Sequence, residues 1–492
     1  KMTKYPLTLT QYIDGKVDHG NGQEHEITNP FDNSSICKLK SASKEEVDFA
    51  IENAHATFKS AKWQKMLGRE RGELLNNLAR IVKRDVEKFA YLESIDTGIP
   101  IRETRMEIST SALHFEYFAG HAGKIEGSFQ DLGPRFNYMI REPYGVIGQI
   151  VPWNTPFKLM ARGFAAAFAC GNTMVIKPSI VAPLSILALS DALKEAGFPK
   201  GSVNIITGSG RITGKQIVEH NLIKKVIFTG GGEGGYEILQ QTARNVTPSV
   251  LELGGKGPII VTENIDFDET IDGVLTAAFA RKAEVCFAGT RLYLSNKMHD
   301  KFVDRLSEQA NKIPMGNPLD ESTQLGPLMT KKRVEDISKI VDQSKNEGIN
   351  IICGGYKPKD KNLSKGNFYA PTIATNISHN SHMAQEEIFG PVLSVFKYDD
   401  LNDAVEKSND SDFGLASYVW SNDIRQAHDL AHRIESGNVF INSYGYQSEI
   451  PFGGYKKSGV GREHGSEAML EYTQSKSITV GMGRFQSRFN LN

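Results

Sequence analysis

Three side chains in this sequence could carry chemistry: a cysteine, a carboxylate and an amide. Cys286 lies in AEVCFAGTR, where small neighbours leave room around the thiol. Such a cysteine is more often a buried hydrophobic residue, but its thiolate is also a strong nucleophile. Glu252 lies inside the apolar run VLELGG, where a buried carboxylate must be paired or functional. Asn154 follows VPW, where an asparagine either shapes a turn or donates a hydrogen bond.

Two glycine-rich turns are candidates for holding a phosphate. FTGGGEGG (228–235) follows one apolar run and opens the helical segment YEILQQTA. Backbone N–H groups can approach a phosphate there, and a helix N-terminus favours negative charge, so we expect binding at Gly230 and Gly231. GSGRITG (208–214) lacks the G-x-G-x-x-G spacing of a dinucleotide-binding turn, so a strand-to-helix turn is the favoured interpretation. Lys177 ends another apolar run, where a lysine is usually solvated.

The elements that must position these residues form a regular series. Short apolar runs alternate with helical segments, which predicts a parallel sheet with helices on its faces. Ligands of such sheets lie at the carboxyl ends of the strands, where the candidate residues stand. A charged, helical stretch (42–119) precedes the series, and a second αβ series (257–437) follows it. The runs begin at Val146, Met174, Val203, Val226 and Val250.

The end of the chain has a different residue pattern from the two αβ series. SKSITV, from Ser475, alternates polar and apolar residues and predicts a strand. A single terminal strand needs a sheet to join, which a partner subunit could supply.

Composition excludes several classes of protein. The 492 residues allow two or three domains, and the net charge of −1 gives no reason to expect a nucleic acid partner. No apolar run approaches the roughly 18 residues of a membrane span, and the N-terminus lacks the apolar core of a signal peptide, so we expect no membrane partner and a cytoplasmic location. The four cysteines are far apart without CxxC spacing, which argues against a metal site and a disulfide framework.

Together the motifs resemble the aldehyde dehydrogenase superfamily, in family order and with family spacing. The resemblance implies an α/β, aldehyde dehydrogenase-like fold with two doubly wound α/β domains and a small β oligomerisation element. It predicts a dinucleotide-binding domain (1–123 and 144–254), a catalytic domain (255–455), and an oligomerisation arm with a C-terminal strand (124–143 and 469–492). In this arm, the segment FNYMIREP would combine with the terminal strand SKSITV. The motifs are PWN at Pro152, KPS at Lys177, FTG at Phe228, LELGG at Leu251, CFAGTR at Cys286, EEIFGPV at Glu386 and PFGGYKKSGVGRE at Pro451.

The resemblance also implies a role for each matching residue. Cys286 would attack the aldehyde, and Asn154, with the Cys286 backbone N–H, would hold the oxyanion. Glu252 would activate the water that hydrolyses the thioester. NAD or NADP would be the cofactor, with Lys177 at its adenosine ribose and Glu387 and Phe389 at the nicotinamide end. The complete expected cofactor-binding set is Trp153, Lys177, Ser179, Ile180, Gly208, Gly230, Gly231, Glu387 and Phe389.

Departures from the family pattern bear on cofactor and substrate. Ile180 stands where a glutamate commonly binds the ribose hydroxyls, so we expect NADP to be accepted. Ala283 and Glu284 replace the usual Gly-Gln before the nucleophile.

The helix after Asn154 suggests a polar substrate. Arg162 replaces a common aromatic residue, as in succinic semialdehyde and lactaldehyde dehydrogenases, and Lys158 lies on the same helical face. With the small Thr155, these residues predict a semialdehyde or hydroxyaldehyde. In the alternative interpretation, Arg162 pairs with a protein carboxylate and only shapes the site.

Two other functions are compatible with this fold. A CoA-acylating aldehyde dehydrogenase would pass the acyl group to CoA, but such relatives typically lack the glutamate at Glu252. A non-catalytic structural or binding descendant would not need Cys286, Asn154 and Glu252 together. The expected partners are a small aldehyde and further copies of the chain, as a homodimer or homotetramer.

Overall fold

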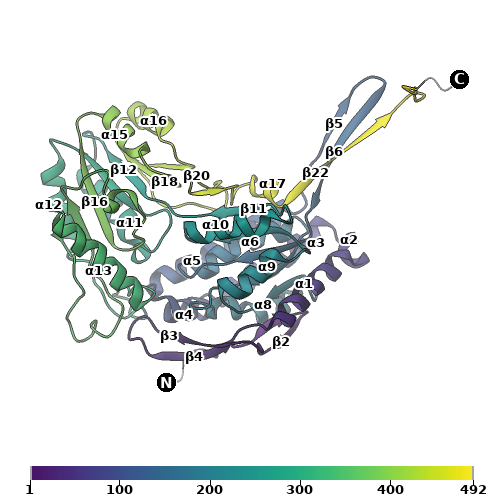
Figure 1. Ribbon diagram of the computed structural model, residues 1–492, viewed down its shortest axis with the longest axis horizontal. Helices are drawn as coiled ribbons and strands as arrows, with labels where there is room; N and C mark the ends of the chain where they lie inside the picture. Colours follow the sequence, from purple (N-terminus) through teal and green to yellow (C-terminus); the bar gives the residue numbers. More distant parts are fainter. Residues whose placement is uncertain (1–2, 490–492) are drawn as a thin grey trace.

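The computed structural model describes residues 3–489 and contains two sheet-centred units and a projecting β arm (Figure 1). Residues 1–2 and 490–492, at the outer ends of two predicted domain ranges, lie outside the described part. The predicted α/β fold is confirmed. None of the helices in the described chain is long and apolar enough to cross a membrane.

The first sheet has eight strands and a parallel centre. The five predicted runs form its neighbouring parallel strands, and strands from both ends of the chain complete it in antiparallel fashion. In spatial order the strands are β2 (Lys16–Asp18), β1 (Gln11–Ile13), β9 (Val203–Ile205), β8 (Thr173–Lys177), β7 (Val146–Ile150), β10 (Ile223–Thr229), β11 (Ser249–Glu252) and β21 (Gly459–Val460).

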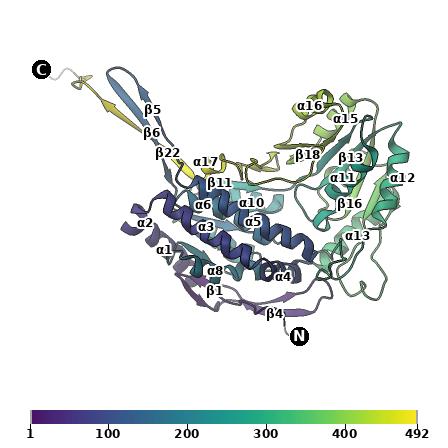
Figure 2. The ribbon, with the colours of Figure 1, turned by 180° about the vertical axis from the view of Figure 1, so that it is seen from behind.

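Helices cover both faces of this sheet. The charged N-terminal stretch is helical as predicted and forms α1 (Lys44–Lys59), α2 (Ala61–Lys65), α3 (Gly68–Arg84), α4 (Val86–Thr97) and α5 (Ile101–His121). The helices between the strands are α6 (Pro156–Ala169), α7 (Leu184–Leu187), α8 (Leu189–Ala196), α9 (Lys215–Glu219) and α10 (Gly232–Ala243). A hairpin of β3 (Glu24–Thr28) and β4 (Ser35–Lys40) lies outside them (Figure 2).

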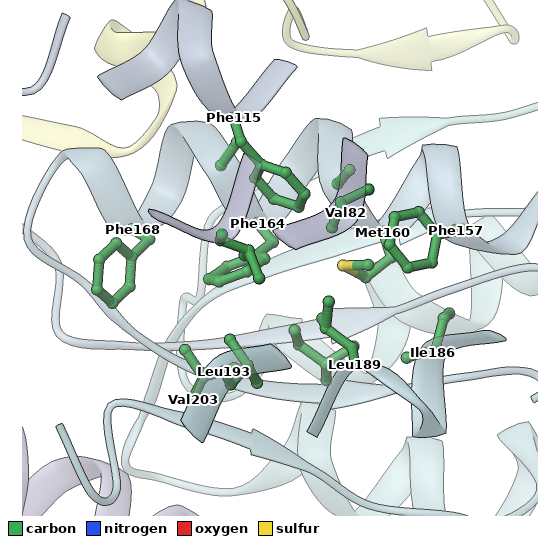
Figure 3. Packing of buried hydrophobic residues seen from close by; sticks show 14 of the residues in the cluster. Val82, Phe115, Phe157, Met160, Phe164, Phe168, Ile186, Leu189, Leu193 and Val203 are labelled. Atoms are coloured by element: carbon green, nitrogen blue, oxygen red, sulfur yellow. The ribbon is translucent and has the colours of Figure 1, made fainter. Parts of the chain in front are cut away.

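The core of the first unit lies around α6, which is buried along its whole length. Phe164 packs edge-on against Phe115 of α5, with ring centroids 5.8 Å apart, and against Phe168 (Figure 3). Because α6 is buried on every side, its polar side chains cannot be solvated by water. The two cations on α6, Lys158 and Arg162, must therefore find partners inside the protein or in a ligand.

The second sheet has seven strands, all parallel except the edge strand β14. Its order is β14 (Asn350–Cys353), β15 (Thr372–Thr375), β16 (Val392–Tyr398), β13 (Gly289–Ser295), β12 (Gly257–Val261), β18 (Ala416–Trp420) and β19 (Asn438–Ile441). Its helices are α11 (Phe267–Phe279), α12 (His299–Ala310), α13 (Lys331–Asn346), α14 (His382–Gln385), α15 (Leu401–Asn409) and α16 (Ile424–Arg433). A small ladder joins β17 (Phe413–Gly414) to β20 (Tyr455–Lys456).

The arm is a three-stranded antiparallel sheet that extends away from the two units (Figure 1). Its strands are β5 (Ser128–Asp131), β6 (Arg135–Pro143) and β22 (Thr473–Gly481), which follows the short helix α17 (Ala468–Glu471). The predicted terminal strand therefore joins its own chain: β22 pairs with β6 from Thr473 opposite Pro143 to Gly481 opposite Arg135.

Candidate active site

One cavity is lined by Cys286 and Asn154, two of the three predicted catalytic residues. It has a volume of about 330 Å³ and lies where the carboxyl ends of β7, β10 and β11 meet the second unit. Seven predicted site residues line it, together with residues that the sequence did not single out. The predicted ones are Trp153, Asn154, Gly230, Gly231, Cys286, Glu387 and Phe389, and the others are Pro152, Thr229, Leu253, Gly254, Arg333 and Ile388.

Cys286 follows an unusual turn between α11 and β13. Burial raises the pKa of its thiol to about 12, Arg162 acts in the opposite direction, and the carboxylate of Glu252 raises the pKa further. The side-chain Nδ2 of Asn154 donates a hydrogen bond to the carbonyl oxygen of Glu284 at 3.0 Å. Glu284 lies two residues before Cys286 in the chain, so this bond holds Asn154 near the nucleophile. The same nitrogen keeps a second N–H, which an oxyanion at Cys286 can accept.

Glu252 ends β11 with only 1% of its surface exposed. Neither carboxylate oxygen has a hydrogen-bond partner within residues 3–489. Burial raises the pKa of this carboxyl to about 8, although Arg162 opposes the shift. A carboxyl with both oxygens available and a pKa near physiological pH can act as a general base.

Two glycines after Glu252 allow the walls of the cavity to meet. A side chain at Gly254 would place its Cβ 2.4 Å from a carboxylate oxygen of Glu387, and one at Gly255 would place it 2.4 Å from the carbonyl oxygen of Cys286. Gly255 also donates its N–H to Oε1 of Glu387 at 2.9 Å. The two glycines of the LELGG motif thus allow Glu387 and Cys286 to lie close to the end of β11.

A second group lies at the ends of β8 and β9. Lys177 is 2% exposed, and its Nζ donates to the carbonyl oxygens of Pro178 and Gly208, each at 3.0 Å. Burial lowers the pKa of this ammonium to about 8. Ser179 and Ile180 are half-buried in the turn that follows. A lysine at a strand end is usually solvated, but this side chain is buried and hydrogen-bonded to Gly208 in the glycine-rich turn 208–214.

The three residues predicted to face the substrate lie on or just before α6. Thr155 is the N-cap residue and is buried. The ammonium of Lys158 pairs with Glu107 at 2.9 Å and lies 4.7 Å from the ring centroid of Tyr446. Arg162 donates from Nη2 to the Thr229 hydroxyl at 3.2 Å, while Nη1 has no partner in the described chain. Lys158 is therefore neutralised by the protein, whereas Arg162 keeps donor capacity.

The sequence missed two residues that shape this cavity. Arg333, on α13, reaches into it between Trp153 and Phe389, with its Cζ 5.3 Å and 5.4 Å from their ring centroids. Thr229 supplies the hydroxyl for Arg162. Arg333 stands in KKRVED, which reads as an exposed helical face and carries no signal of a site.

Comparisons with known proteins agree with this arrangement. The profile of the Aldehyde dehydrogenase family matches residues 17–478. The 4-trimethylaminobutyraldehyde dehydrogenase of Sus scrofa is 39% identical over 92% of either chain. The betaine aldehyde dehydrogenase of Bacillus subtilis (strain 168) is 37% identical over 96% of this chain and 97% of its own.

The solved structures lead to the same family. A betaine aldehyde dehydrogenase from Staphylococcus aureus in complex with NAD+ superposes with a TM-score of 0.96 at 35% identity, over 99% of this chain and 97% of its own. The chain belongs to the aldehyde dehydrogenase family and is an oxidoreductase that oxidises an aldehyde to a carboxylic acid with a nicotinamide cofactor.

Proposed function

We propose that Cys286 is the nucleophile, that Asn154 holds the oxyanion and that Glu252 is the general base. The observation that carries this proposal is where the three residues lie: Cys286 and Asn154 line one cavity, and Glu252 directly precedes Leu253 and Gly254, which line the same cavity. Absorbance at 340 nm, with an aldehyde and NAD or NADP but without CoA, tests it. Formation of reduced cofactor supports hydrolysis, whereas a strict requirement for CoA would favour the acylating alternative.

In the first half-reaction, the Cys286 thiol loses its proton to solvent, and the thiolate attacks the carbonyl carbon and forms a C–S bond as the C=O double bond opens. The carbonyl oxygen becomes an oxyanion, which accepts hydrogen bonds from the Asn154 amide and the Cys286 backbone N–H. A nicotinamide ring held in this cavity would accept the hydride that leaves the carbon, and Cys286 would then carry a thioester.

In the second half-reaction, Glu252 takes a proton from water while the water oxygen attacks the thioester carbon. The C–S bond breaks, the carboxylic acid leaves, and the sulfur returns as thiolate. The buried carboxyl of Glu252, with its pKa of about 8 and no protein partner in the described range, is suited to this task.

The residues present fit a dinucleotide. Gly231 is the N-cap of α10, whose first N–H groups can receive a pyrophosphate. Lys177 and Gly208 lie at the end suited to the adenosine ribose, with Ser179 and Ile180 in the turn that follows Lys177, whereas Gly230 lines the cavity beside Gly231. At the other end, Glu387 would bind the nicotinamide ribose, and Trp153 and Phe389 form walls 5.6 Å apart between ring centroids. We accordingly assign dinucleotide binding to the first unit (1–123 and 144–254) and catalysis to the second (255–455).

NADP should be accepted alongside NAD. Ile180 presents no carboxylate to repel a 2′-phosphate, and Lys177 has only carbonyl partners among residues 3–489. Steady-state kcat/KM for both cofactors measures the preference. Ile180→Glu provides the matched variant and should lower the use of NADP much more than that of NAD. A wild-type preference for NAD of about a thousandfold or more would contradict the expectation.

The substrate that suits Arg162 carries a carboxylate or a hydroxyl. Its guanidinium is 1% exposed, Nη1 lacks a partner, and no carboxylate lies within 4.0 Å of it in the described chain. No carboxylate therefore forms an ion pair with Arg162 in the described chain, and the buried carboxyls of Glu252 and Glu463 act on it only at longer range. A buried guanidinium with spare donors favours an anionic or polar group. A trimethylammonium group, as in the relatives' names, would meet the guanidinium of Arg162 as a like charge. A semialdehyde or a hydroxyaldehyde is the better match.

Arg162→Leu should raise the KM for a semialdehyde by about 10- to 100-fold, the worth of one charge-assisted hydrogen bond. The variant also removes a charge that acts on Cys286 and Glu252, so kcat should fall for every aldehyde. The informative quantity is therefore the ratio of kcat/KM for 4-oxobutanoate and for pentanal. Arg162→Lys is the control, since it keeps the charge. An unchanged ratio would make Arg162 structural and the substrate apolar.

We propose that the arm (124–143 and 469–492) joins copies of the chain into a homodimer or homotetramer. Both edges of its three-stranded sheet are open, and it exposes Phe129 (66%) and Leu132 (52%). Exposed apolar side chains on a sheet with open edges favour pairing with another chain.

We propose a cytoplasmic location. The four cysteines are unpaired thiols, which suits the reducing cytoplasm.

A further inference from the structure

An ion pair joins the turn before Cys286 to helix α13, which carries Arg333, and both Cys286 and Arg333 line the cavity. Glu284 is fully buried, and its Oε2 lies 2.8 Å from Nε of Arg333 on α13. Its Oε1 accepts from the backbone N–H of Met329 at 3.0 Å and lies 2.9 Å from Nζ of Lys282. The carboxylate therefore has one cation on each side, and neither of its oxygens is left without a partner.

On the far side of the pair, Arg333 holds the segment that carries Glu387. Its Nη2 donates to the carbonyl oxygens of Ile388, at 3.2 Å, and Phe389. Phe389 has a φ of +57°, which a bulky residue rarely adopts without support. The guanidinium also lies beside the Trp153 and Phe389 rings. Arg333 thus fixes the backbone and both aromatic walls at this end of the cavity.

On the near side, Glu284 holds the turn before the nucleophile. Arg281, Lys282 and Ala283 have φ values of +50°, +65° and +60°, an unfavourable run for residues other than glycine. The turn persists because its side chains are anchored, Arg281 to Glu107 and Lys282 to Glu284. The Glu284 carbonyl oxygen also receives the Asn154 amide at 3.0 Å.

We propose that the Glu284–Arg333 ion pair is a positioning pair that strengthens binding of the oxidised cofactor relative to the reduced cofactor. It ties the oxyanion amide of Asn154 to the segment Glu387–Phe389, and it neutralises a guanidinium that lines the cavity. The inference rests on the proposed function, because it places the nicotinamide in this cavity. The oxidised nicotinamide ring is a cation and the reduced ring is neutral. An unneutralised Arg333 therefore opposes binding of the oxidised ring alone.

The test measures dissociation constants for NAD+ and NADH by fluorescence titration of the intact enzyme without aldehyde. Glu284→Gln should raise the constant for NAD+ about tenfold relative to that for NADH, because Arg333 loses its counter-charge. Arg333→Gln should shift the ratio in the opposite direction, since Glu284 keeps Lys282. The double variant removes one charge of each sign, which restores the net charge of the Lys282–Glu284–Arg333 cluster and leaves two amides that can hydrogen-bond, and its ratio should return close to the wild-type value. Glu321→Gln is the control, because it removes a carboxylate from the exposed pair with Arg105.

Equal shifts for NAD+ and NADH in Glu284→Gln would overturn the inference, as would a double variant no better than the single ones. If Glu284→Gln does not fold, Arg333→Gln decides alone: an unchanged ratio overturns the inference, and the opposite shift supports it. Failure of the wild-type protein to bind either cofactor would instead overturn the proposed function.

Discussion

Cys286→Ala is expected to abolish aldehyde oxidation, with a loss of turnover of about 10⁴-fold or more, because no other group can form the thioester. The thiol lines the cavity, and its replacement by a methyl group removes one atom without creating a buried charge. The fold and cofactor binding should therefore survive. Reduced cofactor at 340 nm reports turnover, and fluorescence titration reports binding.

Cys37→Ala is the matched control. This cysteine is half-buried on β4, and its replacement should leave turnover unchanged. If Cys286→Ala keeps a tenth of wild-type turnover with unchanged kinetics, another residue is the nucleophile.

Glu252→Gln should still form the thioester but release it about 10²- to 10⁴-fold more slowly, because only the hydrolytic step loses its base. Rapid mixing with excess aldehyde and cofactor should show a burst of reduced cofactor near one per active site, followed by a slow phase. The amide is isosteric and buries no charge, so the fold should persist. Glu252→Asp keeps a carboxylate and should show a faster second phase.

The pH dependence provides an independent check of the same residue. Burial raises the pKa of Glu252 to about 8, so the base is protonated and inactive below that pH and active above it. The hydrolytic rate of the wild-type enzyme should rise with pH through this value, and Glu252→Gln should lose the rise. A slow linear trace without a burst would place Glu252 in acylation or in structure. A burst that becomes steady turnover only with CoA would favour the acylating function.

Much of the fold follows from local patterns. The strands of the first unit begin within a few residues of the predicted positions, because apolar runs bounded by Gly and Pro signal buried parallel strands. Asn154, Lys177 and Glu252 could be predicted because they stand at or near strand ends and inside short motifs. Such residues are brought together by the sheet itself, whose parallel order the βαβ rhythm already implies.

The contacts that sequence could not show join residues far apart in the chain. Glu284 was visible as a departure from the family, but its partner Arg333 is 49 residues away on a helix that reads as solvent-exposed. The pattern of the terminal strand β22 did not identify its neighbour; the family resemblance did, and β22 pairs with β6, more than 300 residues earlier. The left-handed turn 281–283 has no local signal, since its sequence contains no glycine; distant carboxylates stabilise it.

The pairing of β11 with β21 has a consequence for how the chain folds during synthesis. Strand β11, which ends in Glu252, pairs with β10 on one side. On its other side it pairs with β21 (Gly459–Val460), which is synthesised roughly 200 residues later. At roughly 5–20 residues per second, a ribosome needs about 10 to 40 s for that stretch. Through this interval the nascent first unit carries an open parallel edge, a template for unwanted pairing with other chains. The N-terminal half therefore cannot mature before the C-terminal half emerges, and the two units must complete folding together.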